Sequence, residues 1–370
     1  MSESRRSIPS LDGLRAVSII LVVVSHISVL QYIEHSDTFS RAQSIVQTLF
    51  LLGHLGVTVF FVISGFLIMT LLLKDERVDL KKFYFRRTLR IFPPYYFYLF
   101  VVLVCGLAGY LNLSWFNFAA AATYTRNYFF IDSAPGSWYL AHTWSLAVEE
   151  QFYLLLPAVL MLFGRRRGLL AVGAAVLAAP LIRLAYVLND PAEGVEFGRF
   201  ETVADSLAVG CLLAGLRGEL HATRWYGWLM NSNFALLLPP LAVVITWCGY
   251  FPKYFPRPLY AAVAVTVQNL AIAVFLDWAV TNPSGRVGKL LNARPIAYIG
   301  VLSYSIYLWQ QPFLSSELDL PMWARLGLIA AVSLFSYYAI ERPSLRLRQY
   351  LERADWKKSA AVAVGARGLD

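Results

Sequence analysis

Apolar runs long enough to cross a membrane follow one another along nearly the whole sequence. The hydrocarbon core of a bilayer is about 30 Å thick, and roughly 20 helical residues cross it. Only helices and closed barrels satisfy every backbone hydrogen bond inside that core. The sequence therefore predicts an all-α, polytopic membrane helix bundle of about ten transmembrane helices. The expected spans are 11–30, 51–73, 91–110, 146–163, 168–188, 203–216, 230–250, 259–280, 296–313 and 322–340.

The composition excludes an ordinary soluble domain, because 58% of the residues are hydrophobic and only 15% are charged. Soluble domains are near a quarter charged. We expect the bundle to occupy 1–345 and a cytoplasmic tail to occupy 346–370. The segment 115–124 is apolar but short, which is typical of a re-entrant or interfacial piece. The three cysteines lie far apart in apolar runs, so no metal site is predicted.

The distribution of positive charge predicts the orientation. With the N-terminus inside, 24 of the 32 Lys and Arg residues fall in inside loops and 5 in outside loops. Inside loops of membrane proteins carry such an excess. We therefore expect both termini in the cytoplasm and the bundle in the cytoplasmic (inner) membrane. The net charge of +9 is explained by this pattern and by contact with membrane lipids, and nucleic acid is not an expected partner.

The first predicted span carries ionisable residues, which are costly in a membrane and therefore candidates for function. Arg15 and His26 are eleven residues apart, which places them on one helix face about 16 Å apart along the axis. His26 alone is equally consistent with an interhelical hydrogen bond that stabilises packing. Arg15 alone is consistent with a side chain that reaches the membrane surface.

A second candidate site lies at the inner end of the third span, where Arg86, Arg87 and Arg90 are close together. Guanidinium groups suit phosphate recognition. The alternative is that these residues set topology or contact anionic lipid.

A third candidate site contains Glu149 and Glu150, which begin an apolar run. A carboxylate meeting His26 in one cavity would pair a general base with a group that orients it. Both carboxylates are alternatively interfacial. The sequence shows no phosphate-binding loop, dinucleotide fingerprint, nucleophile elbow or zinc-protease motif.

These residues lie in six segments that occur in the order of a known family. The segments are LDGLRAVSIILVVVSH, FFVISGFLI, FYFRRTLRIFPPYY, TWSLAVEEQFYLLLP, SYSIYLWQQP and SYYAIERP. The sequence resembles acyltransferase family 3, the bacterial membrane O-acyltransferases that modify lipopolysaccharide O-antigen, exopolysaccharides, nodulation factors and some macrolides. The resemblance covers nearly the whole chain. One departure is Gln310, where many members carry histidine. The esterase-like domain that some members append is not seen, so acceptor delivery is expected to rely on the bundle or on another protein.

The resemblance implies an acyl-CoA donor, usually acetyl-CoA, used as a co-substrate with no permanently bound cofactor. It implies that Arg86, Arg87 and Arg90 bind the CoA phosphates, with Arg15 deeper in the cavity and Ser64 in the second-helix signature of the donor site. His26 is the expected base, acting directly or through a covalent acyl-histidine. Glu149 is expected to orient the imidazole or to guide the acceptor.

The expected acceptor is a hydroxyl of a cell-surface carbohydrate or glycolipid, and a small secreted molecule such as a macrolide is the alternative. His26 lies roughly 22 Å from the start of its helix, so we expect an externally facing acceptor. A sugar or lipid transporter is the rival class, since ten helices with intramembrane charge also suit a carrier. The oligomeric state is left open.

Overall fold

The computed structural model describes residues 8–34, 42–74, 78–129, 138–189, 198–250 and 255–352, and every regular element in these ranges is helical. The long helices are α1 (Leu11–Glu34), α2 (Ala42–Leu72), α3 (Leu80–Leu107), α6 (Thr143–Asn189), α7 (Phe200–Ala222), α9 (Leu238–Tyr250), α11 (Val265–Thr281), α13 (Arg294–Phe313) and α14 (Met322–Ser336). The short ones are α4 (Trp115–Ala122), α5 (Trp138–Ala141), α8 (Arg224–Asn231), α10 (Arg257–Leu259) and α12 (Arg286–Leu291). Two 3₁₀ turns, η1 (Arg126–Tyr128) and η3 (Asn233–Leu237), and two π-helical turns, η4 (Tyr260–Ala264) and η5 (Tyr337–Glu341), complete the fold.

Six helical stretches of the described chain are long and apolar enough to cross a membrane, or seven if a pair bent by 70° is one span. The all-helical, multi-pass class is therefore confirmed, while six to seven spans meet these criteria and the number of about ten stays a prediction. The stretches are Leu11–Leu30, Leu52–Leu72, Leu80–Leu107, Trp138–Asn189, Arg257–Thr281 and Met322–Glu352, and the bent pair is Arg224–Asn231 with Asn233–Gly249.

Two features explain the difference in span number. The predicted spans 146–163 and 168–188 are both helical and lie within α6, where two helices meet at a sharp kink at Gly164 with φ 73° and ψ 170°, and the stretch Trp138–Asn189 counts them together. Glycine adopts this left-handed region without the steric cost that a Cβ brings. The predicted spans 203–216 and 296–313 are helical, within α7 and α13, but these helices are too polar to meet the criteria for a membrane span. The orientation of the termini stays a prediction.

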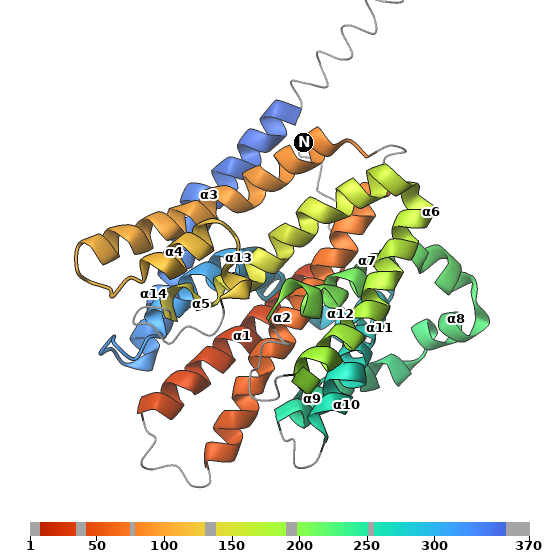
Figure 1. Ribbon diagram of the computed structural model, residues 1–370, viewed down its shortest axis with the longest axis horizontal. Helices are drawn as coiled ribbons and strands as arrows, with labels where there is room; N and C mark the ends of the chain where they lie inside the picture. The colour runs from red at the N-terminus through yellow and green to blue at the C-terminus, as the bar shows by residue number, and fades with distance from the viewer. Residues whose placement is uncertain are drawn as a thin grey trace, which may run out of the picture.

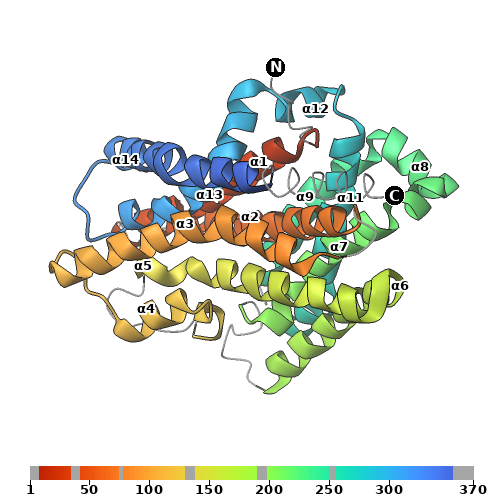
Figure 2. The same cartoon turned by 90° about the horizontal axis from the view of Figure 1, so that it is seen from above.

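The centre of the bundle consists of α1, α2, α7 and α13, with α1 packed on α2 and α13, and α2 packed on α7. Helices α3 to α5 and α14 lie on one side of this centre and α8 to α11 on the other (Figures 1 and 2). Close packing depends on glycines. A Cβ at Gly65 of α2 would overlap the carbonyl oxygen of Leu207, and one at Gly300 of α13 would overlap the carbonyl oxygen of Asp12.

The apolar segment at 115–124 forms the eight-residue helix α4 and not a span. Its first turn is capped by Ser114, whose hydroxyl accepts a hydrogen bond from the backbone of Asn117. Tyr95 and Tyr96 of α3 donate to the carbonyl oxygens that end α4, over 2.8 and 3.0 Å. α4 therefore lies against α3.

A fully buried ion pair and its hydrogen bonds join α6, α7 and α11. Arg183 of α6 donates to Asp205 of α7 over 3.0 Å and to Thr266 of α11 over 2.6 Å. Arg183 also donates to the carbonyl oxygens of Ala261 and Thr202. Because the guanidinium and the carboxylate have several partners each, we interpret this network as structural.

Candidate functional site

Five charged side chains from four elements converge within the bundle, and we call them the charged cluster: Arg15, Arg87, Arg90, Glu149 and Glu341. Glu149 lies within electrostatic range of Arg87 and Arg15. Arg90 lies within the same range of Arg15, Arg87 and Glu341. These residues come from α1, α3, α6 and η5, and the 3.6-residue period of α3 puts Arg87 and Arg90 on one face. The cluster combines three fixed positive charges with carboxylates, so it can bind an anion between helices.

Hydrogen bonds and stacking hold the cluster's side chains in place. Ser64 donates to Glu149 over 2.7 Å, and Ser305 donates to Glu341 over 3.0 Å. The guanidinium of Arg87 stacks 3.7 Å above the ring of Tyr153. Ser64 is therefore in the predicted neighbourhood, in contact with a carboxylate.

The three arginines at the start of α3 do not act as one group. Arg87 and Arg90 join the charged cluster, whereas Arg86 forms two hydrogen bonds to Glu352, over 2.8 and 3.2 Å. The Arg86 side chain is 38% exposed. Adjacent residues on a helix point about 100° apart, so Arg86 and Arg87 face different surroundings.

A second group of polar side chains surrounds the predicted base, and we call it the histidine cluster: His26, His142, Gln310 and Trp138. His26 Nδ1 lies 3.1 Å from Oε1 of Gln310. In the tautomer whose Nδ1–H donates to this amide oxygen, Nε2 keeps its lone pair. Trp138 packs edge-on to the His26 ring at 5.7 Å and donates to the carbonyl of Gln311. The imidazole is thereby held in the tautomer that a base requires.

The hydrogen bond that orients His26 comes from Gln310 and not from Glu149, which bonds Ser64. The two clusters are nevertheless connected. Tyr307 of α13 makes a short hydrogen bond to Ser145, one turn of α6 before Glu149, and lies within electrostatic range of Glu149. Tyr307 also packs against His142, so this hydroxyl pair links the charged cluster to the histidine cluster.

Sequence reasoning missed His142 and gave Gln310 no partner. His142 lies just outside the predicted span 146–163, so its burial was not expected, although it directly precedes the TWSL segment. In the structure only 3% of His142 is exposed. A histidine adjoining an apolar helix was the available signal.

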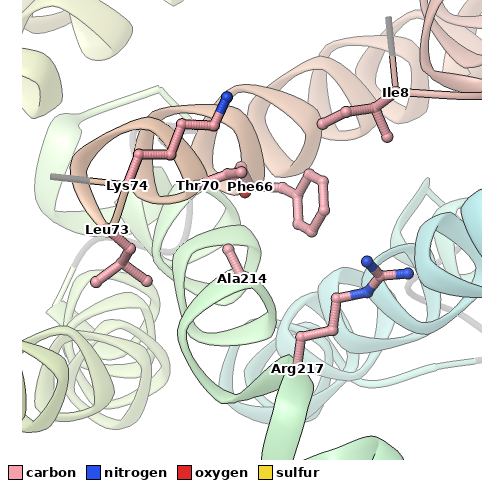
Figure 3. Close-up of a pocket in the computed structure, with 7 residues that line it drawn as sticks. All are labelled: Ile8, Phe66, Thr70, Leu73, Lys74, Ala214 and Arg217. Carbon is pink, nitrogen blue, oxygen red and sulfur yellow. The ribbon is translucent and has the colours of Figure 1, made fainter. Parts of the chain in front are cut away.

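Two surface hollows lie elsewhere, at the ends of α2 and α7. One measures about 400 Å³ and presents Lys74 and Arg217 among apolar side chains (Figure 3). The other, of about 460 Å³, shares Arg217 and adds His221. Arg217, His221 and Tyr226 all bond the buried carboxylate of Asp277, over 2.6, 2.8 and 2.8 Å. None of the predicted site residues lines these hollows. Within the described ranges no group of His, Cys, Asp and Glu is arranged to hold a metal ion.

A family comparison covers the part of the chain that carries these side chains. The family described as an acyltransferase domain matches residues 8–340. The chain belongs to the acyltransferase 3 family. The resemblance seen in the sequence is thus confirmed, over a range that includes both clusters except Glu341.

Curated relatives share this domain. The chain is 29% identical to a peptidoglycan O-acetyltransferase, OatA, of Listeria monocytogenes, over 92% of this chain and 56% of the relative. It is 28% identical to a putative peptidoglycan O-acetyltransferase, YrhL, of Bacillus subtilis, over 98% and 60%. It is 29% identical to the O-acetyltransferase OatA of Staphylococcus aureus, over 92% and 57%. The chain therefore spans less than two thirds of the length of these relatives. No solved structure matches it.

Proposed function

We propose that this chain is a membrane-bound O-acyltransferase that moves an acetyl group from acetyl-CoA to a hydroxyl of a cell-surface carbohydrate. Membership of the acyltransferase 3 family over residues 8–340 supports acyl transfer and disfavours the transporter alternative. The printed functions of the relatives support an acetyl group and make peptidoglycan the first acceptor to test. Lipopolysaccharide, exopolysaccharide and a small secreted molecule such as a macrolide are the other acceptors.

The observation that carries the proposal is the hydrogen bond between His26 and Gln310, because it leaves Nε2 as the basic nitrogen. Nε2 removes the proton from the acceptor hydroxyl while the oxygen forms a bond to the thioester carbonyl carbon. The C–S bond then breaks, and His26 returns the proton to the leaving thiolate. A covalent acyl-His26 intermediate would use the same nitrogen.

The charged cluster supplies the donor site in this mechanism. Arg87 and Arg90 bind the phosphates of CoA, and Arg15 lies deeper, on the helix face that carries His26. Glu149, which accepts a hydrogen bond from Ser64, holds the guanidinium groups in position. A membrane-spanning arrangement of this kind lets the long pantetheine arm bring the thioester toward His26.

The proposal is tested by replacing the base. We expect His26→Ala in detergent to bind acetyl-CoA as the wild type does but to lose transfer by about 10²–10⁴-fold, the usual contribution of a general base. The measurements are transfer of radiolabelled acetyl to peptidoglycan fragments and CoA binding. His221→Ala is the matched control, because His221 bonds Asp277 outside both clusters.

Three outcomes separate the alternatives. A wild type that is folded but neither binds nor turns over acetyl-CoA contradicts the proposal and returns transport to consideration. Full activity in His26→Ala assigns His26 to packing. A stoichiometric burst of free CoA without acceptor indicates the covalent acyl-His26 route.

A further inference from the structure

His142 is a buried histidine that the mechanism above does not use. It lies at the junction of α5 and α6, and only 3% of the residue is exposed. Neither ring nitrogen has a partner at hydrogen-bonding distance and angle within the described residues, and the backbone carbonyl of Leu308 is the group that interacts with the ring from a little farther away. Buried polar side-chain atoms without a partner are uncommon and call for an explanation, such as a ligand that is bound during function. The ring therefore offers one donor and one acceptor to a molecule that enters the bundle.

The position of the ring is determined by its surroundings and not by bonds of its own. Tyr98 and Tyr307 pack edge-on against it, each with ring centres 5.4 Å away. The backbone is held too, because Tyr307 donates to the carbonyl of His142 over 2.9 Å. At the other end of α5, Trp138 donates to the carbonyl of Gln311 over 2.9 Å. The short helix α5 is thus attached to one turn of α13 at both ends, and the imidazole is preorganised.

The turn of α13 that holds His142 also holds the partner of the base. His142 lies beside the backbone of Leu308 and within electrostatic range of His26. Gln310 bonds His26 through its oxygen, and its Nε2 has no hydrogen-bond partner in the described chain. Two N–H groups without a partner at hydrogen-bonding distance and angle, from His142 and Gln310, therefore lie in the neighbourhood of the His26 ring.

We propose that His142 is a second catalytic residue, whose neutral imidazole N–H binds the carbonyl oxygen of the acyl donor and stabilises the oxyanion that forms there. This inference rests on the proposed acyl transfer. Fixed donors aimed at a developing oxyanion in a water-poor site contribute strongly to acyl-transfer rates. A neutral histidine acting as the electrophile is known in other enzymes.

The step balances without a further reactant. The hydroxyl proton moves to Nε2 of His26, the new O–C bond forms, and the carbonyl electron pair moves onto oxygen, where the His142 N–H meets it. Collapse reforms the carbonyl and breaks the C–S bond, and the thiolate takes the proton from His26. His142 keeps its own proton throughout.

Two kinds of substitution separate a donor from a packing residue. His142→Phe keeps an aromatic ring between Tyr98 and Tyr307 but has no N–H. His142→Asn and His142→Gln keep an N–H near the position of Nδ1 or Nε2 and do not titrate. Acetyl transfer and acetyl-CoA binding are measured for each purified variant, with thermal stability as the folding control.

We expect His142→Phe to lower kcat by about 10²–10³-fold, as loss of one oxyanion donor does, with acetyl-CoA affinity nearly unchanged. We expect kcat of His142→Asn or His142→Gln to be at least tenfold higher than kcat of His142→Phe. Wild-type kcat in His142→Phe overturns the inference, and so do Asn and Gln variants that fold and are as inactive as Phe. If His142→Phe fails to fold, the test is decided by comparing kcat of the Asn and Gln variants with kcat of the wild type. A wild type without acetyl-CoA turnover contradicts the proposed function itself, which is a separate result.

Discussion

At the scale of single residues, the site depends on which of two neighbouring side chains faces inward. Arg86 and Arg87 are adjacent and chemically identical, yet Arg86 bonds Glu352 at the surface and Arg87 stacks on Tyr153 beside Glu149. An exposed ion pair contributes little free energy, whereas a charge-assisted hydrogen bond to a phosphate contributes about 1.5–3 kcal/mol. The two arginines are therefore expected to differ in their effect on donor binding.

We predict that Arg87→Gln and Arg90→Gln each weaken acetyl-CoA binding by about tenfold or more, because each removes a cation from the charged cluster. Arg86→Gln is the matched control and is expected to change affinity by less than about threefold. Calorimetry or radioligand binding in detergent measures the difference. Equal losses for Arg86 and Arg87 would show that the donor phosphates contact all three arginines, as the family resemblance implies.

The structure gives Gln310 a role that the sequence did not reveal. In the sequence it is a departure from relatives that often carry histidine. In the structure it accepts the Nδ1 proton of His26. Residues that bond the second nitrogen of a histidine decide which nitrogen is basic. Glutamine can fill that role without a charge, which suits a position that is fully buried.

At the scale of elements, the contact between α1 and α13 aligns the reacting groups. α1 carries Arg15 and His26, and α13 carries Gln310 and Tyr307. The two helices approach closely at Gly300, where a Cβ would overlap the carbonyl oxygen of Asp12. Backbone atoms cannot rotate out of the way as a flexible side chain can, so a larger residue must push the two helices apart.

We predict that Gly300→Leu destabilises the protein by about 1–3 kcal/mol and lowers acetyl transfer, because it separates His26 from Gln310. Thermal unfolding in detergent and transfer assays on the same sample measure both effects. Gly327→Leu in α14 is the control, since a Cβ there meets no atom within 4 Å. Unchanged stability and activity in Gly300→Leu would contradict the packing described for α1 and α13.

At the scale of the whole molecule, the two clusters lie at different depths of one helix. Arg15 belongs to the charged cluster and His26 to the histidine cluster, and the eleven residues between them correspond to about 16 Å along α1. A CoA molecule whose phosphates lie near Arg15 would present its thioester far from the side by which it entered. The acetyl group would then cross the membrane by reaction and not by diffusion of the donor.

We predict that protein in sealed vesicles, with acetyl-CoA on the side of the charged cluster, acetylates peptidoglycan fragments only on the opposite side. Sidedness is measured with acceptors trapped inside or added outside, and orientation by protease access to the tail at 353–370. Detergent-opened vesicles, in which both acceptors react, are the control. Acetylation confined to the acceptor on the CoA side would contradict transfer across the membrane.

The sequence by itself determined the features that depend on local geometry. Apolar length indicated a helical membrane protein, and the helical period placed Arg15 with His26, and Arg87 with Arg90, on shared faces. The sequence also separated the two apolar runs on either side of Gly164, where the structure has a kink between two helices.

The tertiary structure decided which side chains meet across the fold. Gln310 is 284 residues from His26, and Glu352 is 266 residues from Arg86. Asp205 pairs with Arg183, which is 22 residues away on another helix. No local pattern encodes such pairs, because they depend on how α1, α3, α6, α7 and α13 pack. Local periodicity determines which face a residue occupies, whereas only packing determines what that face contacts.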